Sequence, residues 1–319
     1  MSQGKEKRQE RIRKQLANVI TETSFDGLGE KYIGKVRDCY AAGDRRYLIT
    51  SDRISCFDRV LSTVPYKGQV LTQLALYWFE KTKDIWPNHM IAAPDPNVML
   101  VKNCEVVPIE MVVRGYLAGS AWRDYEAGKD ISGITLPEGL RNHCKFPEPL
   151  ITPSTKAADG DHDLPISEED LLQQEIVAPE IWEQMKEAAL KLFSFGQKLA
   201  AKQGLILVDT KYEFGIYEGQ LLVVDEIHTL DCSRYWLADS YEERFQAGDS
   251  PQMLDKENMR QWLLDKGYKG EGEPPEIADN YRVEMSELYL DSYQKITGQE
   301  LEIDNQDLVE RIGGNLGLV

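Results

Sequence analysis

Acidic and basic side chains alternate along one segment of the chain, residues 205–236, between runs of aliphatic residues. If the first part is an extended strand, Asp209, Lys211 and Glu213 point to one face, because successive side chains of a strand point to opposite sides. The residues between them then form a second, largely apolar face. A strand that is apolar on one face and charged on the other belongs to the core and needs partners for its charges. We therefore interpret this segment as a catalytic hairpin.

The second strand of this hairpin decides which carboxylates meet. A two-residue turn at 218–219 places Glu213 opposite Val224, whereas a three-residue loop at 218–220 places Glu213 opposite Asp225. We predict the three-residue loop. Two carboxylates at cross-strand distance repel each other unless a cation lies between them, and Mg²⁺ that bridges to phosphates is the usual cation. The alternative is a surface hairpin with solvated charges.

A glycine precedes two cationic residues near the start of the chain. In the segment 31–40, Lys35 and Arg37 follow Gly34, and we expect both to share a face of the first strand of a hairpin. Glycine permits close approach of the backbone to a ligand, so this hairpin is a candidate phosphate clamp. A solvated strand face is the alternative.

A second candidate anion site follows a predicted strand at 106–113. Arg114 closes this strand, and small residues follow it up to Ser120. A strand end that carries arginine before a turn of small residues suits an anion. A plain glycine turn with a solvated arginine is the alternative.

The remaining pattern predicts the elements around these groups. Helical spacing of apolar residues occurs at 5–20, 70–86, 179–203, 255–266 and 275–297. The segments 98–105 and 106–113 are expected to be paired strands, and 51–60 a structured polar loop. The segment 131–165 lacks periodicity and predicts a long loop, in which Lys156 lies near several aspartates. A flexible acidic loop is the alternative there.

The composition restricts the class of protein. A chain of 319 residues suffices for one large or two moderate domains. The net charge of -17 disfavours binding to nucleic acid or anionic membranes. Five scattered cysteines fit reduced thiols, and no apolar run reaches the length of a membrane span. We therefore expect a soluble cytoplasmic protein whose anionic ligands are held by local basic clusters, as a monomer or a homodimer.

Taken in order, seven motifs resemble those of the SAICAR synthetase family, the phosphoribosylaminoimidazole-succinocarboxamide synthases. They are GKVRDCY at 34–40, SDRISCFD at 51–58, KGQVLTQL at 67–74, VVRGYLAGSAW at 112–122, PSTKA at 153–157, DTKYEFG at 209–215 and DEIHTLDCSRYW at 225–236. The second and fifth motifs are similar to the yeast-type branch. Cys56 and Tyr66 depart from the residues usual in the family, and neither replaces a reacting group.

The resemblance implies an α+β fold with an ATP-grasp and kinase-like nucleotide cleft. A mainly antiparallel N-terminal domain, residues 1–107, would clamp the nucleotide. A larger mixed α/β domain, residues 108–319, would carry the substrate and metal sites. The implied reaction is the ATP-dependent ligation of carboxyaminoimidazole ribonucleotide (CAIR) to L-aspartate, which gives SAICAR, ADP and phosphate in purine biosynthesis through an acyl phosphate.

The resemblance also implies roles for individual residues. The nucleotide is assigned to Lys35, Arg37, Glu105, Val106, Pro108 and Glu110. The chemistry is assigned to Asp209, Lys211, Glu213 and Asp225, the last two as Mg²⁺ ligands. The ribonucleotide is assigned to Arg114, Ser120, Ser233, Arg234 and Arg260. Aspartate is assigned to Asp52, Arg53, Ser154, Thr155 and Lys156, with the segment 154–163 expected to close over the site.

Two other functions remain compatible with the sequence. A small-molecule kinase with the same nucleotide cleft would leave the phosphoryl group on its product, and its ATP turnover would not depend on L-aspartate. A non-enzymatic acidic binding protein, in which the charged hairpin has no chemical role, would not bind Mg-ATP.

Overall fold

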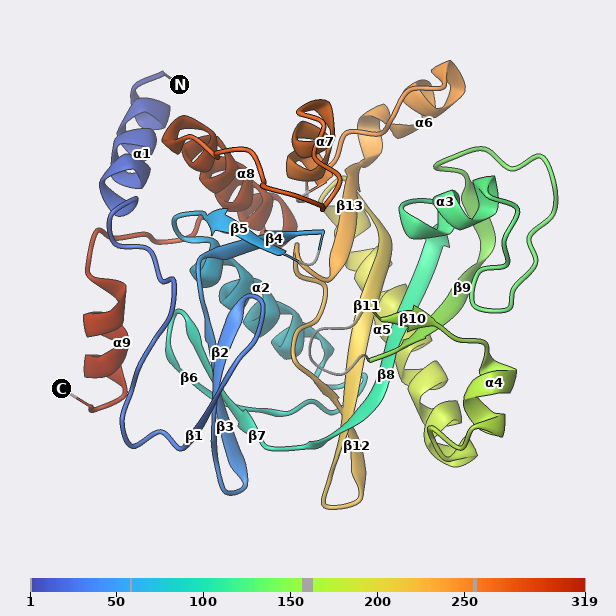
Figure 1. The fold of residues 1–319 in the computed structure, drawn as a ribbon, viewed down its shortest axis with the longest axis horizontal. Coiled ribbons are helices and arrows are strands. Elements are labelled where there is room, and N and C mark those ends of the chain that lie inside the picture. Colours follow the sequence, from blue (N-terminus) through green and yellow to red (C-terminus); the bar gives the residue numbers. More distant parts are fainter. Residues whose placement is uncertain (1, 58, 157–162, 255–256, 319) are drawn as a thin grey trace. The chain divides into compact units, whose positions relative to one another are not determined.

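The computed structural model describes residues 2–57, 59–156, 163–254 and 257–318, and the chain divides into two compact units (Figure 1). The first unit comprises Met1–Tyr77, Met90–Asn103 and Leu254–Val319. The second comprises Trp78–His89 and Cys104–Met253. Both units combine helices with antiparallel sheets, which confirms the predicted α+β class. The units are similar in size, and residues 254–319 group with the first unit, whereas the sequence placed them in a larger second domain.

The first unit contains a five-stranded antiparallel sheet of order β1-β2-β3-β7-β6. Its strands are β1 (Glu30–Ile33), β2 (Arg37–Ala42), β3 (Arg45–Thr50), β7 (Val98–Lys102) and β6 (Met90–Asp95). The segment 31–40, predicted to be one strand, is a hairpin of β1 and β2, because the N–H of Gly34 donates to the Arg37 carbonyl at 2.8 Å and closes a turn. The predicted polar loop at 51–60 contributes to a second hairpin, β4 (Arg53–Cys56) with β5 (Arg59–Thr63).

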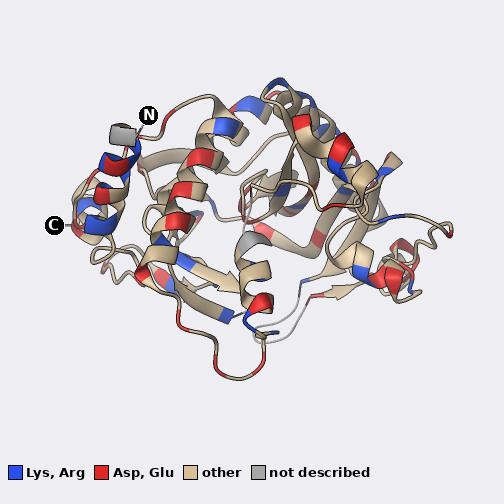
Figure 2. Cartoon of the chain, turned by 90° about the horizontal axis from the view of Figure 1, so that it is seen from above, with Lys and Arg blue, Asp and Glu red and all other residues tan. Residues whose placement is uncertain are grey.

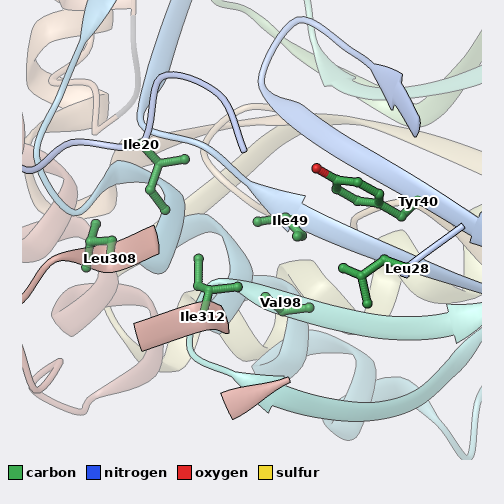
Figure 3. Close-up of a cluster of buried hydrophobic side chains, with 7 residues drawn as sticks. All are labelled: Ile20, Leu28, Tyr40, Ile49, Val98, Leu308 and Ile312. Atoms are coloured by element: carbon green, nitrogen blue, oxygen red, sulfur yellow. The ribbon is translucent and has the colours of Figure 1, made fainter. Parts of the chain in front are cut away.

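Helices from both ends of the chain complete the first unit. They are α1 (Ser2–Gln15), the first part of α2 (Lys67–Thr82), α7 (Glu257–Asp265), α8 (Asp279–Thr297) and α9 (Leu308–Asn315). One core cluster joins Leu308 and Ile312 of α9 to Ile49 of β3 and Val98 of β7 (Figure 3). The C-terminal helix therefore shares a core with strands that lie more than 200 residues earlier in the sequence.

The second unit contains a six-stranded sheet whose spine is a single long strand. The order is β10-β9-β8-β11-β12, with β13 paired to another part of β11. The strands are β10 (Leu164–Pro165), β9 (Lys145–Thr155), β8 (Glu105–Tyr116), β11 (Leu205–Tyr217), β12 (Gln220–Val224) and β13 (Ser233–Leu237). One edge of β11 is thus covered by β8, and the other is shared between β13 and β12.

Two predictions that involve strands of this sheet were wrong. The segment 131–165, expected to be a long loop, contains β9. Prolines interrupt the alternation of apolar and polar residues by which a strand is recognised in the sequence. Proline is compatible with an edge strand, and β9 pairs along its length with β8 but on its other side only with the two-residue β10. The strands expected to pair at 98–105 and 106–113 do not pair with each other. β7 pairs with β3 and β6, and β8 pairs with β9 and β11.

Helices cover the sheet of the second unit. They are α3 (Ser120–Glu126), α4 (Glu168–Gln173), α5 (Pro179–Lys202) and α6 (Ala238–Ala247). The helix predicted at 179–203 is confirmed as α5, which lies behind β11 and β8 in Figure 1 and contacts both. Met185, Ala188 and Leu192 recur at helical spacing and are buried, so α5 presents its apolar face to the back of the sheet.

Acidic and basic residues are distributed along the helices and loops (Figure 2). Within the ranges that the structure describes, no helix combines the length and the apolar character that crossing a membrane requires.

Candidate active site

The charged face of β11 forms the spine of the site. Asp209, Lys211 and Glu213 occupy alternate positions of the strand and therefore share a face, as predicted, over roughly 14 Å. Tyr212 points the other way and is fully buried. The aliphatic run 205–208 before this segment, and Phe214 and Ile216 after it, keep β11 in the centre of the sheet. The strand thus fixes three charged groups in a row at the front of the sheet.

Four side chains of alternating charge meet at the middle of this row, and we call them the Lys211 cluster: Glu110, Lys156, Lys211 and Glu213. Lys211 Nζ donates to Glu213 Oε1 at 3.0 Å and also to Glu110. Lys156 Nζ donates to the other oxygen of Glu213. Strand register brings them together, because Glu213 of β11 lies opposite Glu110 of β8, and Glu110 lies opposite Ser154 of β9.

The electrostatics of the Lys211 cluster follow from burial and pairing. Burial opposes ionisation of Glu213, but the ammonium groups of Lys211 and Lys156 outweigh it and lower the pKa to about 2. Burial raises the pKa of Glu110, and Lys211 offsets this only in part. Burial disfavours the charged form of Lys211, yet Glu213 and Glu110 raise its pKa well above the ordinary value. Lys211 is therefore a fixed cation and not a general base at neutral pH.

The predicted register of the catalytic hairpin was wrong. Glu213 lies opposite Val224, and Tyr217 pairs with Gln220, so the turn has two residues. Glu218 has φ 50° and Gly219 has φ 79°, the two left-handed conformations that a type I′ hairpin turn requires. Asp225 follows β12 in a left-handed conformation, with φ 64°, and lies outside the ladder. The two carboxylates are consequently not a cross-strand pair.

Two arginines converge on Asp209 at the other end of the row. Arg114 of β8 and Arg234 of β13 each lie opposite Asp209 in their respective ladders. Arg114 Nη1 is 3.4 Å from Asp209 Oδ2, and Arg234 Nη1 donates to the same oxygen. Arg114 also donates to Thr152 Oγ1 at 2.9 Å and to Ser120 Oγ at 3.2 Å. We call Arg114, Asp209 and Arg234 the arginine cluster, which carries one net positive charge.

A glycine makes room for the arginine cluster. Gly119 precedes α3 with φ 61°, a left-handed conformation. A Cβ atom there would lie 2.3 Å from Nη2 of Arg234, closer than any real contact. The predicted anion cradle at 114–120 therefore places Arg114 and Ser120 beside Arg234, with Gly119 as the residue that allows their approach.

Other predicted residues lie apart from this group. Ser233 Oγ donates to Thr210 Oγ1 at 2.7 Å and is buried, so its hydroxyl faces Thr210 and not the arginines. Thr155 Oγ1 donates to the Leu164 carbonyl at 3.4 Å. Of the segment expected to close over the site, residues 157–162 lie outside the described part of the chain.

The first residues of β8 were predicted to bind adenine through their backbone. Glu105 and Val106 pair with β11 on one side. On the other side the ladder with β9 begins at Ile109, and the N–H of Lys156 donates to the Pro108 carbonyl at 3.0 Å. The segment 105–107 therefore lies beyond the β9 ladder, at a sheet edge where backbone groups are available to a ligand.

Sequence reasoning missed Thr152 and did not foresee Glu110 as the partner of Lys211. Thr152 positions Arg114 from β9, the strand that was mistaken for a loop. Glu110 meets Lys211 across 101 residues of sequence. A correct assignment of β9 would have indicated Thr152, whereas no local signal marks a pairing as distant as that of Glu110.

Comparison with known proteins identifies the family. The family model described as SAICAR synthetase matches residues 30–275. The chain belongs to the SAICAR synthetase family. The phosphoribosylaminoimidazole-succinocarboxamide synthase of Bacteroides thetaiotaomicron is 45% identical over 306 residues, which cover 93% of this chain and 98% of that relative. The synthase of the same name from Legionella pneumophila strain Paris is 47% identical over 294 residues, 90% of this chain and 93% of that relative.

Solved structures of SAICAR synthetases have the same fold. The enzyme from Saccharomyces cerevisiae complexed with SAICAR matches with a TM-score of 0.78 at 31% identity, covering 89% of this chain and 100% of its own. A type-2 SAICAR synthetase in complex with ADP matches with a TM-score of 0.67 at 26% identity, covering 86% of this chain and 100% of its own. The resemblance inferred from the seven motifs is thus confirmed.

Within the first unit, the SAICAR synthetase motif at 34–40 forms the turn between β1 and β2. Lys35 is exposed on this turn, whereas Arg37 begins β2 and is buried, so they do not share a strand face as predicted. The buried side chain of Arg53 stabilises this turn. Its guanidinium donates to the carbonyls of Lys35 at 3.0 Å and Gly34 at 2.9 Å, and to Asp38 at 2.9 Å.

Asp52, beside Arg53 in the second SAICAR synthetase motif, is fully buried. Its carboxylate accepts the N–H groups of Ile20 at 2.9 Å and Gly68 at 3.0 Å, and burial raises its pKa to about 6. The side chains of Asp52 and Arg53 therefore hold neighbouring backbone segments in place through hydrogen bonds. Arg260 of α7 lies over the ring of Phe57, 5.0 Å from its centre.

Proposed function

We propose that this SAICAR synthetase uses ATP to join CAIR to L-aspartate, which gives SAICAR, ADP and phosphate. The observation that carries the proposal is the pair of charged clusters on one face of β11. The arginine cluster has a net positive charge and suits a phosphate monoester, and the Lys211 cluster supplies a fixed cation beside the ionised carboxylate of Glu213. Family membership favours the ligase over a small-molecule kinase.

The chemistry requires activation of a carboxylate. A carboxylate does not form an amide with an amine at neutral pH, because it lacks a leaving group. Transfer of the γ-phosphoryl group of ATP to a carboxylate oxygen of CAIR releases ADP and forms an acyl phosphate. The α-amine of aspartate then attacks the acyl carbon, the carbon–oxygen bond to phosphate breaks, and the amine loses a proton. Lys211 stabilises the negative charge of the transferring phosphoryl group.

Positioning follows from the same residues. Arg114 and Arg234 hold the phosphate of CAIR, with Ser120 as a further donor. The contact of Arg260 with the ribonucleotide stays a prediction. The backbone of 105–108 is the proposed contact for adenine, and Lys35 and Arg37 are the proposed contacts for the ATP phosphates. Lys156, with Ser154 of β9, is the proposed contact for aspartate, and Thr155, which bonds to the Leu164 carbonyl, is left out. Asp52 and Arg53 are engaged with backbone, so we leave them out of the substrate contacts.

Magnesium is proposed to be held by Glu213 and Asp225. The described residues contain no group of three or more His, Cys, Asp and Glu side chains able to hold a metal. Mg²⁺ in phosphoryl-transfer enzymes usually takes one or two carboxylates and completes its shell with phosphates and water. An ionised Glu213 fits this, as does Asp225, whose charge helps to raise the pKa of Lys211. When bound, the ion neutralises phosphate charge. The cytoplasmic location and the oligomeric state stay predictions.

A coupled assay of ADP release tests the function. The purified chain is supplied with Mg-ATP and CAIR, with L-aspartate present or omitted in parallel. We expect ADP release that requires both CAIR and aspartate, with SAICAR formed in equal amount. Equal ADP release without aspartate would assign the chain to the small-molecule kinases, and no release would favour a binding protein.

A further inference from the structure

The face of β11 that points away from the Lys211 cluster carries a buried hydrogen bond. The Tyr212 hydroxyl and Nε2 of His228 are 2.6 Å apart, and both side chains are fully buried. Burial lowers the pKa of His228 to about 3, so its ring is neutral at physiological pH. Nδ1 of His228 has no hydrogen-bond partner among the described residues. The contact with Tyr212 is therefore the hydrogen bond that orients this ring.

Packing leaves the ring of His228 little freedom. Trp78 contacts it edge to face, with ring centres 4.7 Å apart. Gly196 of α5 lies directly behind it, and a Cβ atom at Gly196 would come within 2.4 Å of Cε1. Any larger residue at that helical position would displace the imidazole. The imidazole of His228 therefore packs tightly against α5 and the buried face of β11.

The segment 225–232, which contains His228, links β12 to β13 in an unfavourable backbone conformation. Asp225 has φ 64° and His228 has φ 51°, left-handed values that cost free energy for residues other than glycine. Such conformations persist only where surrounding contacts impose them. The Tyr235 hydroxyl donates to the His228 carbonyl at 2.7 Å and supplies one of these contacts. The hydrogen bond with Tyr212 of β11 supplies another.

The same segment completes the hydrogen bonding of β11 between its two edge partners. The β13 ladder ends at Thr210 and the β12 ladder begins at Glu213. Between them, the N–H of Lys211 donates to the Cys232 carbonyl at 2.9 Å. Tyr212 is thus anchored to the segment at a point flanked by Lys211 and Glu213, the two residues of the site that carry charge there.

We propose that Tyr212 and His228 act as a pair of positioning residues that fix the segment 225–232 against β11 and thereby hold Asp225 in place relative to Glu213. The pair touches no substrate, because both side chains lie on the buried face of the sheet. The inference rests on the proposed function, in which Asp225 and Glu213 act together during phosphoryl transfer. Loss of the pair therefore lowers the rate of the chemical step and spares the binding of CAIR at the arginine cluster.

The test is the substitution Tyr212→Phe, which removes one hydroxyl and keeps the ring. We expect kcat to fall by about five- to tenfold, the effect of losing one neutral hydrogen bond, with the KM of CAIR unchanged. Hydrogen exchange in the ligand-free chain is the second measurement. The amides of Lys211 and Ser233 should exchange faster, since both bond to the segment 225–232.

Variants of His228 and a matched tyrosine provide the controls. His228→Leu removes the ring nitrogen and should match Tyr212→Phe, whereas His228→Gln keeps a polar group and should restore part of kcat. Leu and Gln meet the same backbone strain at φ 51°. Tyr66→Phe removes another buried hydroxyl, which donates to the Asp304 carbonyl at 2.9 Å in the first unit. It should lower stability similarly and leave kcat unchanged.

Unchanged kcat in Tyr212→Phe, or a loss of kcat equal to that of Tyr66→Phe, would make the pair merely structural and overturn the proposal. A lower kcat with unaltered exchange at Lys211 and Ser233 would also overturn it, because the segment would not have moved. Failure of the proposed function is recognised separately, as absence of aspartate-dependent ADP release by the unsubstituted chain. The exchange measurement still decides the inference in that event.

Discussion

At the scale of single residues, the Glu213 carboxylate is held by two cations. Each of its oxygens accepts from a different ammonium group, Lys211 on its own strand and Lys156 at the end of β9. A carboxylate shared in this way stays ionised although it is nearly buried. It therefore keeps two cations ordered in a site that must receive several anionic substrates.

Substitution of Glu213 should change how stability depends on pH. The pKa is lowered in the folded chain, so the stabilisation is complete above the ordinary value of 4.5 and disappears as the pH falls towards about 2. We expect Glu213→Gln to lower the free energy of unfolding at pH 7, on the order of 3 kcal/mol at most. Urea unfolding of both proteins between pH 7 and acid measures it. A difference that persists undiminished at the acid limit would contradict the assignment.

Substitution of Arg114 should weaken the use of CAIR and leave the use of ATP almost unchanged. Arg114→Ala removes a charged, nearly buried donor from the arginine cluster, which costs about 1.5–3 kcal/mol for a charge-assisted contact. We expect the KM of CAIR to rise by about 10- to 150-fold, with the KM of ATP almost unchanged. Arg141→Ala is the matched control, because its guanidinium lies over the ring of Phe245 in the same unit. Equal effects on both substrates would reassign Arg114 to the ATP side.

At the scale of elements, the turn between β11 and β12 determines where the carboxylates lie. The aliphatic runs of both strands made the hairpin predictable, because buried central strands require them. The turn length was not predictable from residue type. Glutamate rarely adopts the left-handed conformation that a two-residue turn demands. Tertiary structure imposes this conformation on Glu218. An error of one residue moved Asp225 from a ladder position to the segment after the strand.

The strain at this turn is open to a direct measurement. Glu218→Asn places at φ 50° a residue that tolerates this conformation, in the Asn-Gly order preferred by type I′ turns. We expect a gain of about 0.5–1 kcal/mol in the free energy of unfolding with activity unchanged. Gly219→Ala, at φ 79°, is the opposite control and should lose about 1 kcal/mol or more. If both variants shifted stability in the same direction, backbone strain would not be the cause.

At the scale of the whole molecule, the sequence indicated the α+β class and the family but not the grouping of distant segments. Seven local motifs suffice for a resemblance, because each is read within about ten residues. The arginine cluster needs Arg114 and Asp209 to meet across 95 residues, and no periodicity reports such a contact. The C-terminal helices raised the same difficulty, since their apolar faces showed no sign of which sheet they cover.

The core of the first unit should depend on its last helix. Ile312 of α9 is fully buried among residues of β2, β3 and β7 (Figure 3). We expect Ile312→Ala to lower the free energy of unfolding by about 2–4 kcal/mol through the cavity it leaves. Val309→Ala on the same helix is the control, because this side chain is 37% exposed, and it should cost less than about 0.5 kcal/mol. Denaturant unfolding compares them, and equal costs would mean that α9 does not belong to this core.

The division of the chain has a consequence for its synthesis. The first unit begins at the N-terminus but also requires Leu254–Val319, whereas the second is complete once Met253 has emerged. At about 5–20 residues per second, the ribosome needs roughly 3–13 s more to make the missing segment. During that interval Ile49 and Val98 lack Leu308 and Ile312, the residues of α9 that complete their core cluster. The unit whose first residues are made first is thus the unit that is completed last.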